Sequence, residues 1–417
     1  MITLFILKSG ARGMQYGIGT YIRELTESLL KIEGIKIFLI SYHNINCKEL
    51  SFTTISDRYT EINIPSPLFH MSQNNSFDKR YASSVVRLLS DFIPQNGKVV
   101  FQMNYLDDLS IANKLKEKYK YPVISIVHFT QWQQLFVGNR KKLSGLNIDQ
   151  PSNNIEFTLS REKEMYRVSD HIVSVTRYMK DFLINDYSIN PEKITVIPNG
   201  LDYSKYGTIS KDERNSLKQR LGFGKDEIIV LFSGRIDPCK GIFYLLEAFE
   251  EACKHNHSLR LVLLGQGNIQ DCLKRYKSFF GKITYTGFLP SKQVLTFYQI
   301  ADIGIIPSIY DHCPYVALEM IGHNIPLIIS NTEGLNEILT DNQSVYLTPV
   351  FDSEGNITFD KIELAGAILS LLGDDKLKAD LITADYPYLI KTRFSAKRMS
   401  KEFSSALLRI KKVSVEV

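Results

Sequence analysis

The stretch that decides the fold is IIVLFSGRIDPCKGIFYLLEAFEEACK, residues 228–254. It opens with residues 228–233, which are apolar except for the last and are typical of a buried strand. A turn with two glycines follows, and residues 242–254 then place Phe243, Leu246 and Phe249 on one helical face. A strand that passes through such a turn into an amphipathic helix is the repeating unit of a parallel α/β sheet.

The same alternation continues on both sides of this stretch. Further apolar runs predict strands at residues 2–7, 35–41, 98–101, 123–127, 171–175, 194–197, 260–264, 303–306 and 327–330. Helical periods, such as residues 21–31, lie between them, so each sheet should be covered on both faces. Because the pattern restarts after the polar residues 204–227, we expect two Rossmann-like α/β domains, residues 1–197 and 198–394.

Composition narrows the class of protein. Of the 417 residues, 44% are hydrophobic and 23% are charged, as in ordinary globular proteins. The five cysteines are scattered and form neither a CxxC pair nor a Cys/His cluster, which argues against a disulfide scaffold and a structural metal. The apolar run at residues 2–7 is too short for a signal peptide, and no run is long enough to span a bilayer. We therefore expect a cytoplasmic protein.

Three common nucleotide-binding patterns are absent. Gly10-x-x-Gly13, Gly17-x-Gly19 and Gly265-x-Gly267 follow predicted strands, but none of them continues as GxGxxG. The chain also contains no P-loop and no Asp-x-Asp pair, which a metal bridging carboxylates to a nucleotide diphosphate would need. An NAD enzyme, a P-loop NTPase and a metal-dependent nucleotide-sugar enzyme are all disfavoured.

The first candidate site is the turn SGRIDPCKG at residues 233–241. Gly234 permits an unusual backbone angle at the end of the strand. Arg235 and Lys240 stand on either side of Pro238, next to the start of a helix. Two cations beside a helix N-terminus suit a diphosphate, and a surface turn with two solvated cations is the alternative.

The second candidate site is PSIYDHCPYVALEM at residues 307–320. A strand ends, a loop carries Asp311, and Pro314 suits the first turn of a helix in which Glu319 lies one turn further along. Two carboxylates at this crossing could accept hydrogen bonds from sugar hydroxyls. A helix that is merely capped by acidic residues is the alternative.

Together with VIPNGLD at residues 196–202, LGQG at 264–267 and GFL at 287–289, these motifs resemble the retaining family-four glycosyltransferases. The first half resembles that family more loosely, through GIGT at 17–20 and VHF at 127–129. The resemblance implies the GT-B fold, in which two Rossmann-like domains face each other across a cleft. It also implies retaining, metal-independent transfer of a hexosyl or related sugar from a nucleotide-diphosphate donor to an acceptor hydroxyl, in glycan or glycoconjugate assembly. The nucleotide-sugar would be a co-substrate, and no other cofactor is expected.

The resemblance also implies a role for each matching residue. Arg235 and Lys240 would hold the donor diphosphate, His128 would lie over the transferred sugar, and Asp311 would contact that sugar. The other expected donor-binding residues are Glu319, which would bind the ribose, and Gly17, Gly19, Gly234, Gly265, Gly287 and Leu289. The family usually has Glu where this chain has Asp311, whose side chain is shorter but carries the same charge.

Several alternatives stay open at this point. A nucleotide-sugar epimerase, a phosphorylase of similar shape and a non-catalytic sugar-nucleotide binder share the expected architecture. The acceptor could be a saccharide or a lipid-linked sugar, with a peptide as the second choice. A nucleic-acid partner is disfavoured, because the net charge is only +5 and the basic residues lack interleaved aromatic pairs.

Two further segments concern organisation. Basic clusters at residues 114–120 and 140–142 suit solvated helix faces, and they leave open a peripheral contact between the N-terminal domain and the inner face of the membrane. Residues 395–412 form an amphipathic segment with Met399, Phe403 and Leu407 on one face. We expect it to be a final helix that packs back on the N-terminal domain, and packing on its own domain is the alternative.

Overall fold

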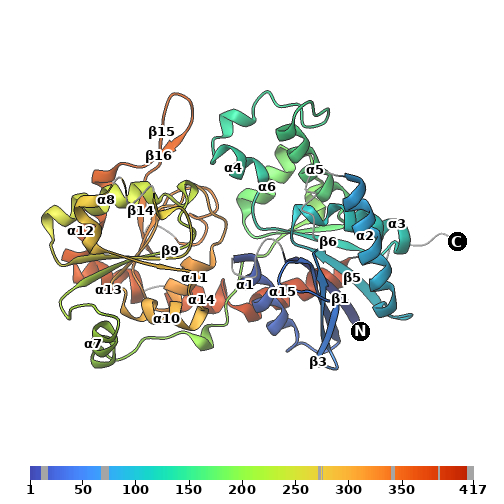
Figure 1. Cartoon of the computed structure of the whole chain (residues 1–417), viewed down its shortest axis with the longest axis horizontal. Helices are drawn as coiled ribbons and strands as arrows, with labels where there is room; N and C mark the ends of the chain where they lie inside the picture. Colours follow the sequence, from blue (N-terminus) through green and yellow to red (C-terminus); the bar gives the residue numbers. More distant parts are fainter. Residues whose placement is uncertain are drawn as a thin grey trace. The chain divides into compact units, whose positions relative to one another are not determined.

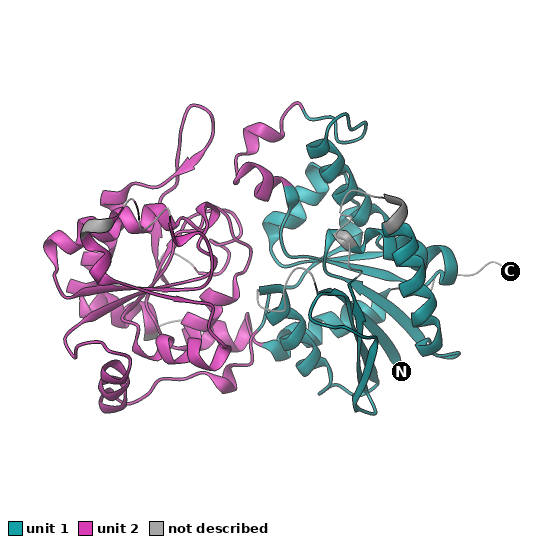
Figure 2. Ribbon diagram, in the orientation of Figure 1, with its two compact units in different colours: residues 1–131, 146–200, 396–417 teal, residues 132–145, 201–395 magenta. Residues whose placement is uncertain are grey.

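The computed structural model describes residues 1–10, 17–66, 75–270, 274, 276–339, 343–383 and 386–410. These residues divide into two compact units (Figure 2). Unit 1 contains residues 1–131, 146–200 and 396–417, and unit 2 contains residues 132–145 and 201–395. The predicted boundary at 197/198 lies close to the break at 200/201. The predicted ranges differ at residues 132–145, which belong to unit 2 although they interrupt unit 1 in the sequence.

Unit 1 is built on an eight-stranded sheet with the order β3-β4-β2-β1-β5-β6-β7-β8. All neighbouring strands are parallel except β3 and β4. The strands are β1 (Ile2–Ser9), β2 (Ile35–Asn44), β3 (Ser51–Ser56), β4 (Tyr59–Pro65), β5 (Lys98–Met103), β6 (Val123–Val127), β7 (His171–Ser174) and β8 (Ile194–Val196).

Helices lie on both faces of this sheet (Figure 1). They are α1 (Gly17–Leu29), α2 (Asn75–Leu89), α3 (Leu109–Tyr119), α5 (Asn154–Val168), α6 (Arg177–Asn185) and α15 (Ala396–Arg409). Helix α15 packs against α1, where the Ser28 hydroxyl donates to the Ala396 carbonyl at 3.1 Å. The last helix among the described residues is therefore part of the first unit, and the predicted residues 411–412 lie outside those residues.

Unit 2 is built on a parallel six-stranded sheet with the order β11-β10-β9-β12-β13-β14. Its strands are β9 (Ile228–Ser233), β10 (Leu259–Leu264), β11 (Ile283–Gly287), β12 (Ile303–Ile306), β13 (Leu327–Ser330) and β14 (Val345–Leu347), and β15 (Val350–Phe351) and β16 (Ile357–Thr358) form a separate hairpin. The helices are α7 (Lys211–Arg220), α8 (Ile242–His255), α10 (Ser291–Ile300), α11 (Tyr315–Gly322), α12 (Lys361–Gly373), α13 (Asp375–Thr383) and α14 (Tyr386–Thr392). Helix α4 (Gln131–Phe136) begins at the boundary between the units.

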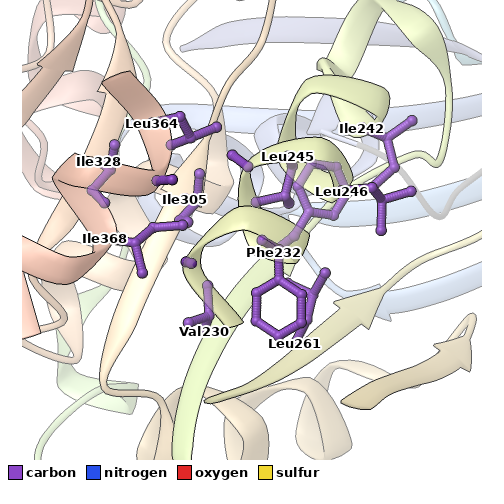
Figure 3. Packing of buried hydrophobic residues seen from close by; sticks show 14 of the residues in the cluster. Val230, Phe232, Ile242, Leu245, Leu246, Leu261, Ile305, Ile328, Leu364 and Ile368 are labelled. Carbon is purple, nitrogen blue, oxygen red and sulfur yellow. The ribbon is translucent and has the colours of Figure 1, made fainter. Parts of the chain in front are cut away.

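The core of unit 2 explains why residues 228–254 form the strand and helix that they do. Val230 and Phe232 of β9 point toward Ile242 and Leu246 of α8, while Leu364 of α12 covers the neighbouring strands (Figure 3). Each of these side chains is at most 2% exposed. Burial of a large apolar side chain contributes about 1.5–3 kcal/mol, so this packing fixes the start of α8 beside the end of β9.

Candidate active site

The turn after β9 places two cations at the carboxyl edge of the second sheet. Arg235 Nη2 lies 3.2 Å from Asp237 Oδ2, and the arginine side chain is 45% exposed. The Asp237 carboxylate also accepts the backbone N–H of Lys240 at 3.2 Å, which caps the short 3-10 helix η6 (Pro238–Lys240). Asp237 therefore fixes the turn that carries both cations.

Lys240 forms the closest ion pair of this region, with the predicted site residue Asp311. Lys240 Nζ lies 2.6 Å from Asp311 Oδ2, and both side chains are mostly buried. Asp311 also accepts the Ser308 hydroxyl at 3.3 Å and the backbone N–H of His312 at 3.1 Å. Pro314 is the N-cap of α11 and no side chain caps that helix, so Asp311 is a ligand of Lys240 rather than a helix cap.

Two glycines bring the backbones of this region into close contact. Gly241 has φ +68°, and a Cβ there would lie 1.9 Å from the carbonyl oxygen of Pro307. A Cβ on Gly265 would lie 1.8 Å from the carbonyl oxygen of Gly234, and the Gly265 N–H donates to the Gly287 carbonyl at 3.0 Å. The three predicted donor-binding glycines 234, 265 and 287 therefore lie side by side at the ends of β9, β10 and β11.

Glu319 of α11 is oriented by a tyrosine that the sequence analysis missed. The Tyr298 hydroxyl of α10 lies 2.8 Å from Glu319 Oε2 and 3.2 Å from Ser233 Oγ. Burial and the nearby charge of Glu319 raise the pKa of Tyr298 well above its usual value, so the phenol keeps its proton. Because a phenol has one proton to give, it donates to the carboxylate and can accept from the serine.

These contacts divide the two predicted carboxylates between two partners. Asp311 is paired with the cation of the η6 turn, whereas Glu319 is paired with the phenol of α10.

Leu289, another predicted donor-binding residue, lies beyond the end of β11 and is half-buried. No local sequence signal identified Tyr298, since an aromatic residue in an amphipathic helix is usually a core residue, whereas Ser233 opens the predicted turn at residues 233–241.

Unit 1 carries the predicted residue His128 directly after β6. Its Nε2 lies 3.3 Å from Asn104 Oδ1, and its ring packs edge-on against Tyr21 with 4.7 Å between centroids. Desolvation lowers the pKa of His128 to about 3. The imidazole is therefore neutral at ordinary pH and can serve as a hydrogen-bonding group, not as a cation.

A small cavity in unit 1 has His128 in its wall, along with Asn104, Tyr105, Gln131, Glu162 and Tyr166. The Glu162 carboxylate accepts the backbone N–H of Gln131 at 2.9 Å and the Tyr187 hydroxyl at 2.7 Å. Desolvation raises the pKa of Glu162 to about 7. A buried acid thus holds the chain just after His128, and the sequence analysis did not identify it.

The predicted glycine loop after β1 is described only in part. Gly17 is the first residue of α1, and a Cβ there would meet no atom within 4 Å. Gly19 is buried within the same helix. Gly13, the second glycine of Gly10-x-x-Gly13, lies outside the described residues. Packing within the described protein therefore does not require a glycine at position 17.

The structure groups most of the predicted site residues of unit 2. Lys240 and Asp311 are in contact, the three glycines are neighbours, and Arg235 belongs to the same turn as Lys240. Gly17, Gly19 and His128 belong to unit 1.

Within the described ranges, no three His, Cys, Asp or Glu side chains are grouped as a metal site would need. Among those same residues, no helix combines the length and apolar character needed to cross a bilayer.

Two family models match the chain and leave few residues between them. The model "Glycosyltransferase Family 4" matches residues 16–205, and "Glycosyl transferases group 1" matches residues 213–386. The first match lies largely within unit 1 and the second within unit 2.

Curated relatives show the same likeness at low identity. An uncharacterized glycosyltransferase of Methanocaldococcus jannaschii is 26% identical over 51% of this chain and 59% of its own length. The alpha-monoglucosyldiacylglycerol synthase of Streptococcus pneumoniae is 26% identical over 85% of this chain and 75% of its own length. Among the first relatives the matched share is usually 41–59%, so the chain spans about half the length of most curated relatives that it matches.

Solved structures share the fold over nearly the whole chain. The Anabaena protein Alr3699/HepE, solved in complex with UDP and glucose, has a TM-score of 0.71 at 15% identity and covers 98% of this chain and 99% of its own. The expected fold class, two Rossmann-like α/β domains, is confirmed.

Proposed function

Because the chain belongs to family four of the glycosyltransferases, with the GT-B fold, we propose that it transfers a sugar from a nucleoside diphosphate to an acceptor hydroxyl with retention of configuration. The observation that carries this proposal is the Lys240–Asp311 pair, 2.6 Å apart at the carboxyl edge of the sheet in unit 2. In open α/β sheets, ligands bind at this edge.

The chemistry of the leaving group fits these residues. Breaking a glycosyl–phosphate bond places negative charge on the diphosphate, and fixed cations directed at that charge lower the barrier. Arg235 and Lys240 would supply those cations, together with the backbone N–H groups at the start of α8. We propose that this charge replaces a metal ion and that no metal is required.

The two carboxylates would then act on different parts of the donor. Glu319, held by Tyr298, would accept the ribose hydroxyls, and Asp311 would accept hydroxyls of the transferred sugar while keeping Lys240 in place. His128, neutral at ordinary pH, would hydrogen-bond the sugar from unit 1. The leaving phosphate could take the proton of the acceptor, so no acid–base pair of carboxylates is needed.

The nucleotide and acceptor are proposed from the relatives. The structural neighbour from Anabaena holds UDP and glucose, which supports a uridine nucleotide as the first donor to test. The synthase from Streptococcus pneumoniae is named for a glucosylated diacylglycerol, which supports a lipid-linked or saccharide acceptor. A peptide acceptor is the second choice.

The direct test is release of nucleotide from UDP-, GDP- and ADP-sugars, with and without candidate acceptors and with excess chelator. We expect one of these donors to be consumed and the activity to survive chelation. NMR should show that the transferred sugar has the same anomeric configuration in the product as in the donor. UDP at 100 times its Kd should also stabilise the protein by about 2.7 kcal/mol. Binding without turnover of any donor would instead identify a non-catalytic sugar-nucleotide binder, and loss of activity that magnesium or manganese restores would refute metal independence.

A further inference from the structure

Residues 132–145 extend from the first half of the sequence into unit 2. Asn139 is 1% exposed, and its Nδ2 donates to the Glu354 carbonyl at 3.1 Å and to Asn356 Oδ1 at 2.8 Å. Val137 packs against the core of unit 2. These contacts anchor the segment on the same unit that carries Asp311.

Within this segment, Gln133 reaches the residue next to Asp311. Gln133 is 1% exposed and His312 is 5% exposed, and Gln133 Oε1 lies 2.6 Å from His312 Nε2. Desolvation lowers the pKa of His312 to about 4, so the ring is neutral. A neutral ring facing an amide oxygen carries its proton on Nε2 and donates it to Gln133.

His312 is fixed on its other sides as well. Its backbone N–H donates to Asp311 Oδ1 at 3.1 Å. A Cβ on Gly334 would lie only 2.3 Å from His312 Nδ1, so the ring fills its pocket and has little room to turn. The orientation of the ring therefore sets the position of the peptide that binds the Asp311 carboxylate.

We propose that Gln133 is a positioning residue for the sugar-transfer step: through its hydrogen bond to His312 it holds Asp311, and with it Lys240, in the geometry that the reaction needs. This inference rests on the proposed function. Gln133 contacts His312, the residue that follows Asp311 in the sequence, so its loss should disturb the reacting geometry more than the affinity for nucleotide.

The test compares Gln133→Met with Gln134→Met. Methionine keeps the volume of Gln133 but removes the acceptor oxygen, and Gln134 is an exposed neighbour of the same type. We expect Gln133→Met to lower kcat by about tenfold to a hundredfold, since misplacement of a reacting group by about 1 Å has effects of this size. The KM for donor and the Kd for UDP should stay within about twofold, because removing the acceptor oxygen of Gln133 leaves the proposed nucleotide contacts in place. Gln134→Met should match the wild type.

A second comparison separates positioning from general damage. If Gln133 acts through His312, then His312→Ala should lower kcat to a similar extent, and the double variant should be no worse than either single variant. Equal kcat in Gln133→Met and Gln134→Met, additive effects in the double variant, or a change confined to thermal stability would each overturn the proposal.

An NMR measurement on the wild-type protein does not depend on activity. The His312 ring should show the Nε2–H form with a slowly exchanging proton, and Gln133→Met should remove that protection. The Nδ1–H form in the wild type would overturn the proposal even if both variants folded poorly. A wild type that turns over no donor but shows the expected Nε2–H signal would contradict the proposed function and leave the Gln133–His312 contact standing.

Discussion

At the scale of single residues, Asp311 and Glu319 should have separable effects. Asp311 is bound to Lys240 and should contact the transferred sugar, whereas Glu319 should hold the ribose that every donor with the same nucleotide shares. Asp311→Asn should therefore lower kcat while leaving the Kd for UDP nearly unchanged, which is the pattern of an interaction made mainly in the transition state. Glu319→Gln should weaken binding of UDP and of UDP-sugar alike. Calorimetry and initial rates on both variants would check this, and an Asp311→Asn variant with normal turnover would exclude a catalytic Asp311.

Tyr298 should matter for nucleotide binding although it was not expected to belong to the site. Tyr298→Phe removes the hydroxyl that donates to Glu319 at 2.8 Å and leaves the ring in place. A hydrogen bond to a charged group contributes about 1.5–3 kcal/mol, so the Kd for UDP should rise by about tenfold or more. Tyr388→Phe, at a tyrosine that is 64% exposed, is the matched control and should bind UDP normally. Equal affinity in the two variants would show that Glu319 does not depend on Tyr298.

At the scale of elements, the junction between η6 and α8 depends on Gly241. Gly241→Ala would place a Cβ 1.9 Å from the Pro307 carbonyl oxygen at φ +68°, so we expect a loss on the order of 2–4 kcal/mol in the free energy of unfolding. Gly366 of α12 has open space around it, and Gly366→Ala should stabilise the protein by about 0.5–1 kcal/mol. Chemical denaturation would measure both changes, and similar stabilities would contradict the close approach at Gly241.

The contact between α5 and the start of α4 should make stability depend on pH. The pKa of Glu162 is raised to about 7 in the folded protein, above its ordinary value of 4.5. A raised pKa means that the folded state binds the proton more tightly, so its contribution is complete below about pH 4.5 and is lost as the pH rises through 7. Relative to Glu162→Gln, which carries no titratable proton there, the wild type should lose on the order of 3 kcal/mol over this interval. Chemical denaturation at both ends of this pH interval would measure the change. If the free energy of unfolding differed between the wild type and Glu162→Gln by the same amount at both pH values, Glu162 would not be protonated in the folded protein.

The strands and helices also show how much of the fold could be predicted from the sequence. The predicted runs 123–127, 228–233, 303–306 and 327–330 coincide with β6, β9, β12 and β13, because a central parallel strand is buried on both faces and is therefore mostly apolar. The hairpin of β3 and β4 was missed, since β3 has an exposed, polar edge and carries no such signal. Likewise, no local pattern could place residues 132–145 in unit 2. That placement depends on pairs such as Gln133–His312, whose members lie far apart in the sequence.

At the scale of the whole molecule, α15 should be essential to the stability of unit 1. Met399, Phe403 and Leu407 are fully buried, and burying three such side chains contributes about 5–9 kcal/mol. That is comparable with the total stability of a domain, about 5–15 kcal/mol. A chain that ends at Ser395 should therefore lose hydrogen-exchange protection in α1, while a chain that ends at Ile410 should keep it. Equal protection in the two chains would show that α15 is dispensable.

The membership of α15 in unit 1 also has a consequence for the order of events during synthesis. Unit 1 contains β1, near the start of the sequence given, but its helix α15 follows about 200 residues that belong to unit 2. At roughly 5–20 residues per second, the helix that covers α1 emerges about 10–40 s after the rest of unit 1 has been made. During that interval the face of α1 that α15 will cover stays open. The nascent chain should therefore offer a chaperone-binding surface on unit 1, and this surface should disappear only after α15 has been synthesised and has packed against α1.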